Sequence, residues 1–285
     1  DNSQETPQRA LDTLTKDHIL SVTHINNFLN VDEGGPMLFL ENNLLRFPQA
    51  KTASAGYGTA MHAILNRSVL YLKKEKHHSK LEEVKQWYTD SLTHERLSRD
   101  DHALYLEKGL SLLPEIYKEK ILTLKGDELT EVDFRHEGVV LKDSDVYVPV
   151  SGKIDLVRFE EGGVWLCDFK TGKEKKSWTG KDAYEKVRLH ANRQQLAFYK
   201  MLIERSKTYN GLHVLGGQLE FLESKGSRLG VLVAEITDEE VERLERLIVA
   251  IYKRIQAHDF TVPESVKALK GLEAVEAFEG LLLGE

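Results

Sequence analysis

Two short stretches decide the fold: Gly152-Lys153-Ile154-Asp155 and Asp168-Phe169-Lys170. They belong to segments in which apolar and polar residues alternate, the pattern of a β-strand, over residues 146–159 and 164–170. Between these segments, Glu160-Glu161-Gly162-Gly163 has the composition of a turn. The sequence therefore predicts a β-hairpin that carries two aspartates and a lysine.

The apolar residues of this hairpin indicate how its strands pair. When the turn is centred on the four-residue segment, Val157 faces Leu166. A shift by one residue would place these apolar side chains on opposite faces of the sheet. The same pairing places Asp155 directly opposite Asp168, with their Cβ atoms about 4.5–5.5 Å apart.

The two facing aspartates point to a divalent cation. Carboxylates this close repel each other, and Mg²⁺ binds carboxylate oxygens together with water and substrate phosphate. Because side chains alternate along a strand, Lys170 lies on the same face as Asp168. There its ammonium group can assist an attacking water and stabilise the charge that develops on a phosphate. An exposed hairpin with unpaired polar side chains is the alternative, since Asp-x-Lys alone is a common sequence.

Periodicity separates a helical N-terminal part from the sheet. Residues 1–17 are polar and lack a sustained apolar period, which predicts a tail or linker. Residues 18–125 are expected to be mostly helical. A short helix there would have Thr23 as its N-cap, and a long one would begin near Gly56-Tyr57-Gly58-Thr59, with His62 in its first turn.

The second half of the chain predicts the sheet. Residues 126–236 alternate in the manner of strands and contain one helix over about 183–205. Residues 237–285 are expected to form C-terminal helices, beginning with Thr237 as an N-cap that three acidic residues follow. The expected fold is therefore α/β, a mixed central sheet flanked by helices, in a single domain over residues 18–285.

Composition excludes several classes of protein. The chain has 285 residues, 41% of them hydrophobic, and no apolar run approaches the roughly 20 residues that a membrane-spanning helix needs. Cys167 is the only cysteine, so the chain can form neither an internal disulfide nor a cysteine-bound zinc or iron–sulfur site. We expect a reducing, cytoplasmic location and no association with a membrane.

The distribution of charge favours a nucleic-acid partner, although the net charge of the chain is −7. Residues 170–200 contain nine basic side chains and three acidic ones. Because affinity for phosphate comes from lysine and arginine, such a basic stripe in an acidic protein is a candidate DNA-binding surface. A solvated loop and helix face would have the same composition, so this alternative stays open.

Two further motifs lie on the expected helices. Gln195 and Tyr199 are four residues apart and therefore share one helix face. His62 follows Gly58 by four residues on the long N-terminal helix. Each motif alone is typical of an ordinary helix, but their order in the chain is distinctive. Gly-x-x-x-His on a helix precedes Gly-x-x-Asp on a strand, then Asp-x-Lys-Thr-Gly on the next strand and Gln-x-x-x-Tyr on the following helix.

This order of motifs resembles the RecB-type branch of the PD-(D/E)XK nucleases, which have a restriction-endonuclease-like fold. Leu20-Ser21-Val22-Thr23 and Leu44-Leu45-Arg46-Phe47-Pro48 are also similar to the nuclease region at the C-terminal end of UvrD-like helicases. The resemblance covers about residues 18–262. It implies a DNA nuclease that uses Mg²⁺ or Mn²⁺, more in the manner of an exonuclease than an endonuclease. A helicase motor, fused upstream or present as a separate subunit, would be its partner in DNA repair or recombination.

The resemblance also implies which groups carry the chemistry. The metal ligands would be His62, Asp155, Asp168 and the backbone carbonyl of Phe169. The catalytic set would be Asp155, Asp168, Lys170, Gln195 and Tyr199. Within it Lys170 would be the catalytic lysine, while Gln195 and Tyr199 would shape the site and meet DNA. Glu131, on a preceding strand, would be a supporting acid.

The chain departs from the pattern of many relatives in one respect. Those relatives bind an iron–sulfur cluster through one early cysteine and three near the C-terminus. Here the early place reads Asn30-Val31-Asp32-Glu33 and no cysteine follows Phe260, which excludes a cluster. Packing must then hold the C-terminal segment, through residues such as Leu269, Phe278 and Leu281 to Leu283.

Two alternatives to a DNA nuclease remain open. A module of the same fold could bind DNA or brace a helicase without cutting, although a disused site would have no need for the facing Asp155 and Asp168. A hydrolase of another class could act on small molecules, although the basic stripe argues against this.

Overall fold

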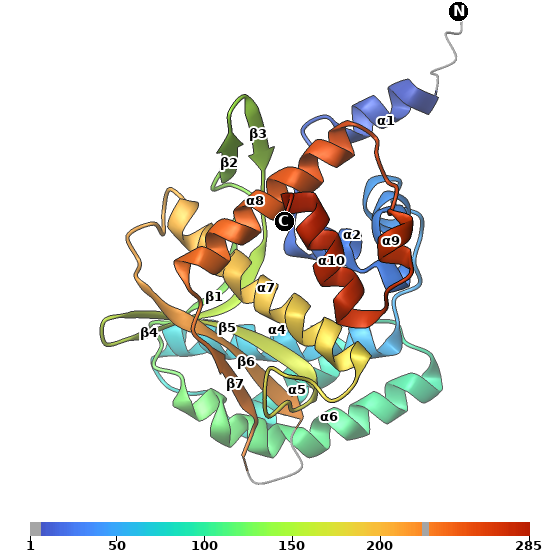
Figure 1. Cartoon of the computed structure of the whole chain (residues 1–285). Helices are drawn as coiled ribbons and strands as arrows, with labels where there is room; N and C mark the ends of the chain where they lie inside the picture. The colour runs from blue at the N-terminus through green and yellow to red at the C-terminus, as the bar shows by residue number, and fades with distance from the viewer. Residues whose placement is uncertain (1–6, 224–227) are drawn as a thin grey trace, which may run out of the picture.

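A five-stranded mixed sheet forms the centre of the computed structural model, which describes residues 7–223 and 228–285 (Figure 1). The strands, in spatial order, are β1 (Leu129–Asp133), β4 (Lys153–Glu160), β5 (Gly163–Lys173), β6 (Val214–Glu223) and β7 (Val231–Ala234). Strands β5 and β6 are parallel, and the other neighbouring strands are antiparallel. This mixed sheet confirms the expected fold class.

The hairpin of β4 and β5 has the pairing that the apolar residues predicted. Val157 faces Leu166, and Leu156 faces Cys167 on the opposite side of the sheet. All four side chains are buried. The register therefore brings Asp155, on the same strand face as Val157, to the level of Asp168.

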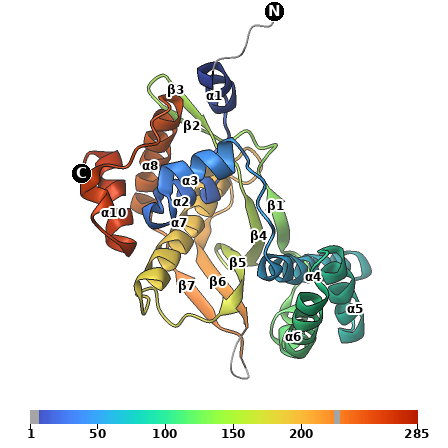
Figure 2. The same ribbon diagram turned by 90° about the vertical axis from the view of Figure 1, so that its right-hand side faces the viewer.

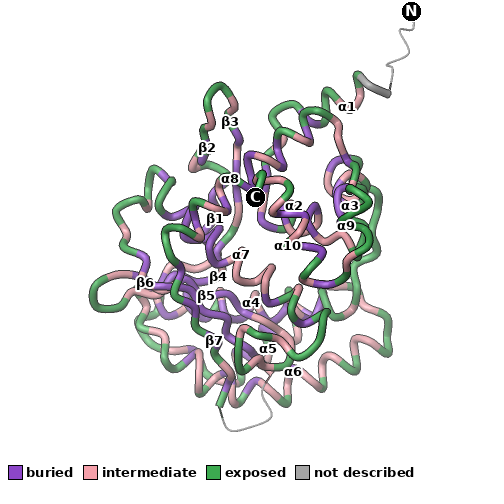
Figure 3. Tube along the Cα trace, viewed as in Figure 1, coloured by how far each residue is buried: buried purple, intermediate pink, exposed green. Residues whose placement is uncertain are grey.

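Helices cover both faces of the sheet (Figure 2). One face packs against α4 (Ala53–Glu75), α5 (Leu81–His94) and α6 (Arg99–Glu119). The other face packs against α2 (Val22–Leu29), α7 (Ala183–Arg205) and α8 (Asp238–Gln256), and α10 (Gly271–Leu283) packs in turn against α7 and α8. The central strands are buried between these layers, as Figure 3 shows in purple.

A glycine on the sheet lets α7 come close to it. A Cβ atom added to Gly217 of β6 would lie 3.0 Å from Cβ of Leu196 on α7 and 2.9 Å from Cδ1 of Ile236. Both distances are shorter than ordinary contacts, so a larger residue would push the helix away. This close approach sets the height of α7 above the strands, and with it the position of the side chains that α7 points at β5.

The N-terminal segment is more regular than its polar composition predicted. Residues Pro7–Thr15 form helix α1 where we expected a tail. Thr15 is buried, and its carbonyl oxygen accepts a hydrogen bond from Nε2 of Gln256 on α8 at 2.7 Å. Contacts with a distant helix therefore order a segment whose own composition does not.

The expected N-terminal helices form, but two of their starting points were wrong. The N-cap of α2 is Ser21, whose Oγ accepts from the backbone N–H of His24, rather than Thr23. Helix α4 begins at Ala53 behind Thr52, so His62 is its tenth residue and lies in the third turn. In both cases a hydroxyl slightly earlier in the chain caps the helix.

The second half follows the prediction closely. Helix α7 has the expected bounds. Thr237 caps α8 by accepting from the N–H of Glu240, whose carboxylate accepts from the N–H of Thr237 in return. Strands β2 (Val140–Asp143) and β3 (Val146–Pro149) were expected to continue the sheet, but they form a separate hairpin beside α8 (Figure 1).

The C-terminal segment is held by packing, in part as expected. Phe278 of α10 is fully buried, and its ring stacks on Phe28 of α2 with centroids 6.0 Å apart. Leu281, however, is 52% exposed. The remaining short helices are η1 (Val31–Glu33), α3 (Gly35–Phe39), η2 (Leu40–Leu44), η3 (Ile121–Thr123) and α9 (Glu264–Lys267). Within the described ranges, no helix combines the length and apolar character needed to cross a bilayer.

Candidate active site

Four side chains from β5 and α7 form a closed ring of polar contacts. Tyr199 donates its hydroxyl hydrogen to Oδ1 of Asp168 at 2.9 Å and accepts from Nε2 of Gln195 at 2.7 Å. The amide oxygen of Gln195 accepts from Nζ of Lys170 at 2.9 Å. Nζ of Lys170 also lies 2.8 Å from Oδ2 of Asp168. Each member therefore fixes the orientation of the next.

The ring exists because two periodicities coincide. Asp168 and Lys170 are two residues apart on a strand, and Gln195 and Tyr199 are four apart on a helix, so each pair shares one face. Asp168 and Tyr199 are buried, whereas Lys170 is partly exposed. Gln195 is partly exposed as well, but of the four side chains Lys170 alone lines the hollow beside the ring, so its ammonium is the best placed to meet a substrate.

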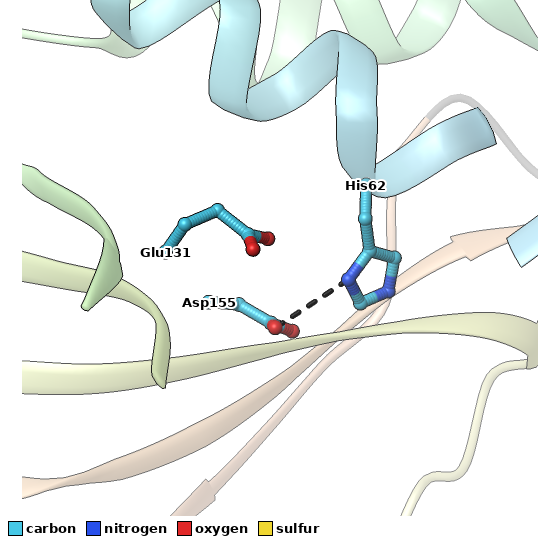
Figure 4. Close-up of side chains that lie close together, drawn as sticks. All are labelled: His62, Glu131 and Asp155. Carbon is cyan, nitrogen blue, oxygen red and sulfur yellow. Dashed lines mark ion pairs between the residues drawn. The ribbon is translucent and has the colours of Figure 1, made fainter. Parts of the chain in front are cut away.

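A second group of side chains adjoins this ring on the side of α4. Nδ1 of His62 lies 3.4 Å from Oδ1 of Asp155 (Figure 4), and its Nε2 donates to the carbonyl oxygen of Phe169 at 3.0 Å. Oδ2 of Asp155 accepts from the backbone N–H of Phe169 at 2.9 Å. Phe169 follows Asp168 directly, so His62 and Asp155 lie next to the ring.

Glu131 completes this second group from β1. Thr130 faces Leu156 and Val132 faces Ile154, which places Glu131 at the level of Asp155. Its φ of 51° is left-handed, an unusual conformation for a non-glycine residue within a strand. Its side chain forms an ion pair with Lys153 and points toward His62 and Asp155 (Figure 4).

His62, Glu131 and Asp155 together could hold a metal ion. Each offers one ligand atom, and these three atoms lie within 4.8 Å of one another. Carboxylate oxygens suit Mg²⁺ and Mn²⁺, and an imidazole is also a common ligand of transition metals. The donor set therefore fits a divalent cation.

Burial and charge perturb the titration of the site. Burial and the neighbouring charge of Asp168 raise the pKa of Asp155, against the opposing contacts with His62 and Phe169. Burial lowers the pKa of His62, but the hydrogen bond and charge of Asp155 outweigh it, so that the pKa is raised. Burial and the charge of Asp168 also raise the pKa of the Tyr199 hydroxyl, which keeps it a hydrogen-bond donor. The carboxylates of Asp155 and Asp168 thus repel each other, and a cation bound near Asp155 would relieve this repulsion.

The structure brings together all the residues that the sequence singled out, with one change in their grouping. Asp168, expected beside Asp155 as a ligand, directs its oxygens at Tyr199 and Lys170. Glu131, expected only as a supporting acid, is a member of the compact ligand group. This grouping could not be predicted from sequence, because the β2–β3 hairpin separates β1 from β4 along the chain and no tight turn sets their register.

The basic stripe divides in the structure. Four of its members line a hollow of about 460 Å³ beside the ring: Lys170, Lys173, Lys175 and Arg188. Arg193 instead pairs with Glu240, and Lys200 is buried against Asp238. Only part of the stripe can therefore meet a substrate at this site.

Comparison with known proteins agrees with the class that the fold and site define, an α/β nuclease domain. Residues 20–267 match the family model of the PD-(D/E)XK nuclease superfamily, and the chain belongs to this superfamily. No curated protein matches the sequence.

Two solved structures are similar to this chain at low sequence identity. A crystal structure of a "Putative exonuclease" from Eubacterium rectale matches 91% of this chain and 87% of its own, with 12% identity and a TM-score of 0.53. The structure of SSO0001 matches 88% of this chain and 85% of its own, with 14% identity and a TM-score of 0.35. The first of these supports the restriction-endonuclease-like architecture.

Proposed function

We propose that this chain is a DNA nuclease that hydrolyses phosphodiester bonds with the help of Mg²⁺ or Mn²⁺. The observation that carries the proposal is the ring in which Asp168, Tyr199 and Gln195 hold Lys170 in place, next to a group of metal-binding side chains. A lysine so oriented beside a cation site is suited to attack on phosphate.

The residues of the site would have two roles, binding of the cation and activation of the attacking water. His62, Glu131 and Asp155 would hold the cation. Asp168 and the backbone carbonyl of Phe169, which lie next to this group, would be further ligands. A cation bound there would polarise a phosphate oxygen and make a nearby water more acidic. Lys170 would orient the attacking water and stabilise the charge that develops on the phosphate.

Tyr199 and Gln195 would act as positioning residues. The hydroxyl of Tyr199 holds Asp168, and the amide of Gln195 holds the ammonium of Lys170. Because the pKa of Tyr199 is raised, its hydroxyl stays protonated and continues to donate to the carboxylate. The geometry of the lysine is then set by helix α7 rather than by β5 alone.

The wider setting follows from the resemblance to RecB-type nucleases. We propose exonuclease action in DNA repair or recombination, beside a helicase motor that is fused upstream or is a separate subunit. The single, buried Cys167 suits a reducing, cytoplasmic location without an iron–sulfur cluster. The structural similarity to a protein described as an exonuclease agrees with this mode of action.

A nuclease assay on single-stranded and duplex DNA tests the proposal. We expect the wild type to cut DNA only when Mg²⁺ or Mn²⁺ is present, and Asp168→Ala to be inactive. Equal cutting by both proteins would reveal a contaminating nuclease. Failure of the wild type to cut any form of DNA would favour a module that binds DNA or braces a helicase without cutting.

A binding assay separates DNA from small-molecule substrates. Lysine and arginine side chains that contact phosphates make binding weaken as salt increases. We therefore expect salt-sensitive binding of DNA when divalent metal is withheld. An absence of binding at low salt would favour a hydrolase of another class.

A further inference from the structure

Two hollows lie on opposite sides of the first turns of α7. The basic hollow is the one that contains Lys170, Lys173 and Lys175, beside the candidate active site. The second hollow, of about 490 Å³, lies between α7, α2 and α10. Tyr184 and Arg188 line both hollows and form the ridge between them.

The ridge carries an aromatic ring that is open to solvent. Tyr184 is 63% exposed, the largest exposed fraction among the large hydrophobic side chains described. Arg188 lies one helical turn further on, with its guanidinium carbon 5.6 Å from the centre of the tyrosine ring. The arginine thus orients the ring and adds positive charge beside it.

The second hollow differs from the basic one in chemistry. Leu29, Val187 and Val275 supply apolar surface, and Asn30 and Gln194 add uncharged amides. Asp32 and Glu33 outnumber Arg188 among its charged lining residues, whereas the basic hollow has four cations against Asp182 and Glu185, so a phosphate group is disfavoured in the second hollow. An apolar slot with amides and an aromatic edge suits the flat face and polar edge of a nucleobase.

We propose that the second hollow receives an unpaired nucleobase of the DNA strand whose phosphates lie in the basic hollow. Tyr184 stacks against this base, and Arg188 contacts the backbone where it crosses the ridge. A base within a duplex is stacked and paired, so the strand must be single-stranded at this point. This inference rests on the proposed DNA nuclease activity and adds the form of DNA and the residue that recognises it.

Binding measured without divalent metal tests the inference, because the DNA then stays intact. Stacking on an aromatic side chain contributes enough that Tyr184→Ala should bind a single-stranded oligonucleotide about 5- to 100-fold more weakly. Tyr184→Phe should bind like the wild type, because the ring is retained. The same substitution should weaken the binding of a blunt duplex of the same sequence much less.

The β2–β3 hairpin offers a matched control. Tyr147 is 57% exposed and has Nζ of Lys142 5.4 Å from its ring centre, so it combines an open tyrosine with a cation, as Tyr184 does. Tyr147→Ala should leave the binding of DNA unchanged. A loss as large as that of Tyr184→Ala would show that any exposed tyrosine has this effect and would overturn the inference.

An abasic nucleotide moved along the oligonucleotide locates the contacted base. The wild type should bind the oligonucleotide more weakly when the abasic nucleotide is at one particular position. For Tyr184→Ala, the affinity should not depend on where the abasic nucleotide is placed. The inference would be overturned if Tyr184→Ala bound single-stranded DNA as tightly as the wild type, or if it lost as much affinity for the blunt duplex as for the single strand. Metal-dependent cutting by the wild type would still support the proposed function in either case. If the wild type neither bound nor cut DNA, both would fall.

Discussion

Two carboxylate clusters on the same sheet, one fully buried and one partly exposed, behave in opposite ways. Glu220 of β6 is fully buried, with Nζ of Lys120 at 2.7 Å and Nη2 of Arg158 at 3.0 Å. Burial raises its pKa, but the two cations outweigh burial and lower it. Asp155 has Asp168 as a neighbour instead, and both burial and that charge raise its pKa.

The difference separates a group that stabilises the fold from one that awaits a ligand. Around Glu220 the positive charges come from the chain itself, so the charged carboxylate suits the folded state. Around Asp155, burial and the charge of Asp168 disfavour the charged form, and the contacts with His62 and Phe169 offset them only in part. A carboxyl group whose pKa is raised in this way therefore marks a candidate binding site for a cation. The four predictions below would break or sharpen this contrast.

The largest effect is expected from Lys170→Ala. Loss of a group that stabilises transition-state charge lowers rates by about 10²- to 10³-fold. Lys170 pairs with the buried Asp168, so urea denaturation must show that the variant remains folded under the assay conditions. The rate of cleavage at saturating DNA measures this. Lys173→Ala, a lysine of the same basic hollow outside the ring, should alter DNA affinity and spare that rate, and an equal loss in both variants would contradict a special role for Lys170.

Glu220→Gln should destabilise the fold strongly. Removing one partner of a buried ion pair leaves Lys120 and Arg158 with uncompensated charge, which costs about 3 kcal/mol or more. Urea denaturation gives the free energy of unfolding. Glu160→Gln, which removes an exposed partner of Lys125, should stay within about 1 kcal/mol of the wild type. A Glu220→Gln protein as stable as the wild type would remove the contrast on which the comparison depends.

Divalent cations should stabilise the wild type. A ligand that binds only the folded state at 100 times its dissociation constant adds about 2.7 kcal/mol. Thermal unfolding with and without Mn²⁺ measures the shift, and Asp155→Asn should abolish most of it.

With a chelator present in place of Mn²⁺, Asp155→Asn should no longer be the less stable of the two proteins. The folded-state pKa of Asp155 is raised, so its charged form opposes folding above that pKa, and Asp155→Asn should be at least as stable as the wild type at neutral pH. A clear loss of stability in chelator would mean that Asp155, like Glu220, serves the fold.

The smallest effect is expected from Tyr199→Phe. A hydrogen bond to a charged group contributes about 1.5 kcal/mol, so loss of the hydroxyl that holds Asp168 should lower kcat by about tenfold. KM should change little, because Tyr199 is buried and its hydroxyl is directed at Asp168. Steady-state kinetics separate the two parameters, and a change in KM alone would point to a role in binding.

The parts of the fold that local patterns specify could be predicted from sequence. A short turn and apolar alternation gave the pairing of Val157 with Leu166 and hence the level of Asp155 and Asp168. The order of motifs located Lys170 as well, because strand alternation fixes which face it occupies. The helix expected over about 183–205 has the same bounds in the structure, where it is α7.

The parts that depend on distant contacts could not be predicted. Helix α1 is ordered against α8, and its polar composition alone indicated a tail. The sequence predicted that Arg193 and Lys200 belong to a basic surface. In the structure they pair with Glu240 and Asp238 of α8, which is distant from them in sequence. The left-handed backbone of Glu131 depends on its setting in the sheet, since the residue type itself disfavours that conformation.

The lone thiol on β5 has a practical consequence. Cys167 is fully buried between Asp168 and the layer of α4 to α6, and burial together with the charge of Glu220 raises its thiol pKa well above the ordinary value. An alkylating reagent attacks the thiolate and so modifies Cys167 only when the strand becomes open to solvent. The rate of alkylation therefore reports how often the central strand opens, and a fluorophore can be attached selectively to a cysteine introduced on the surface.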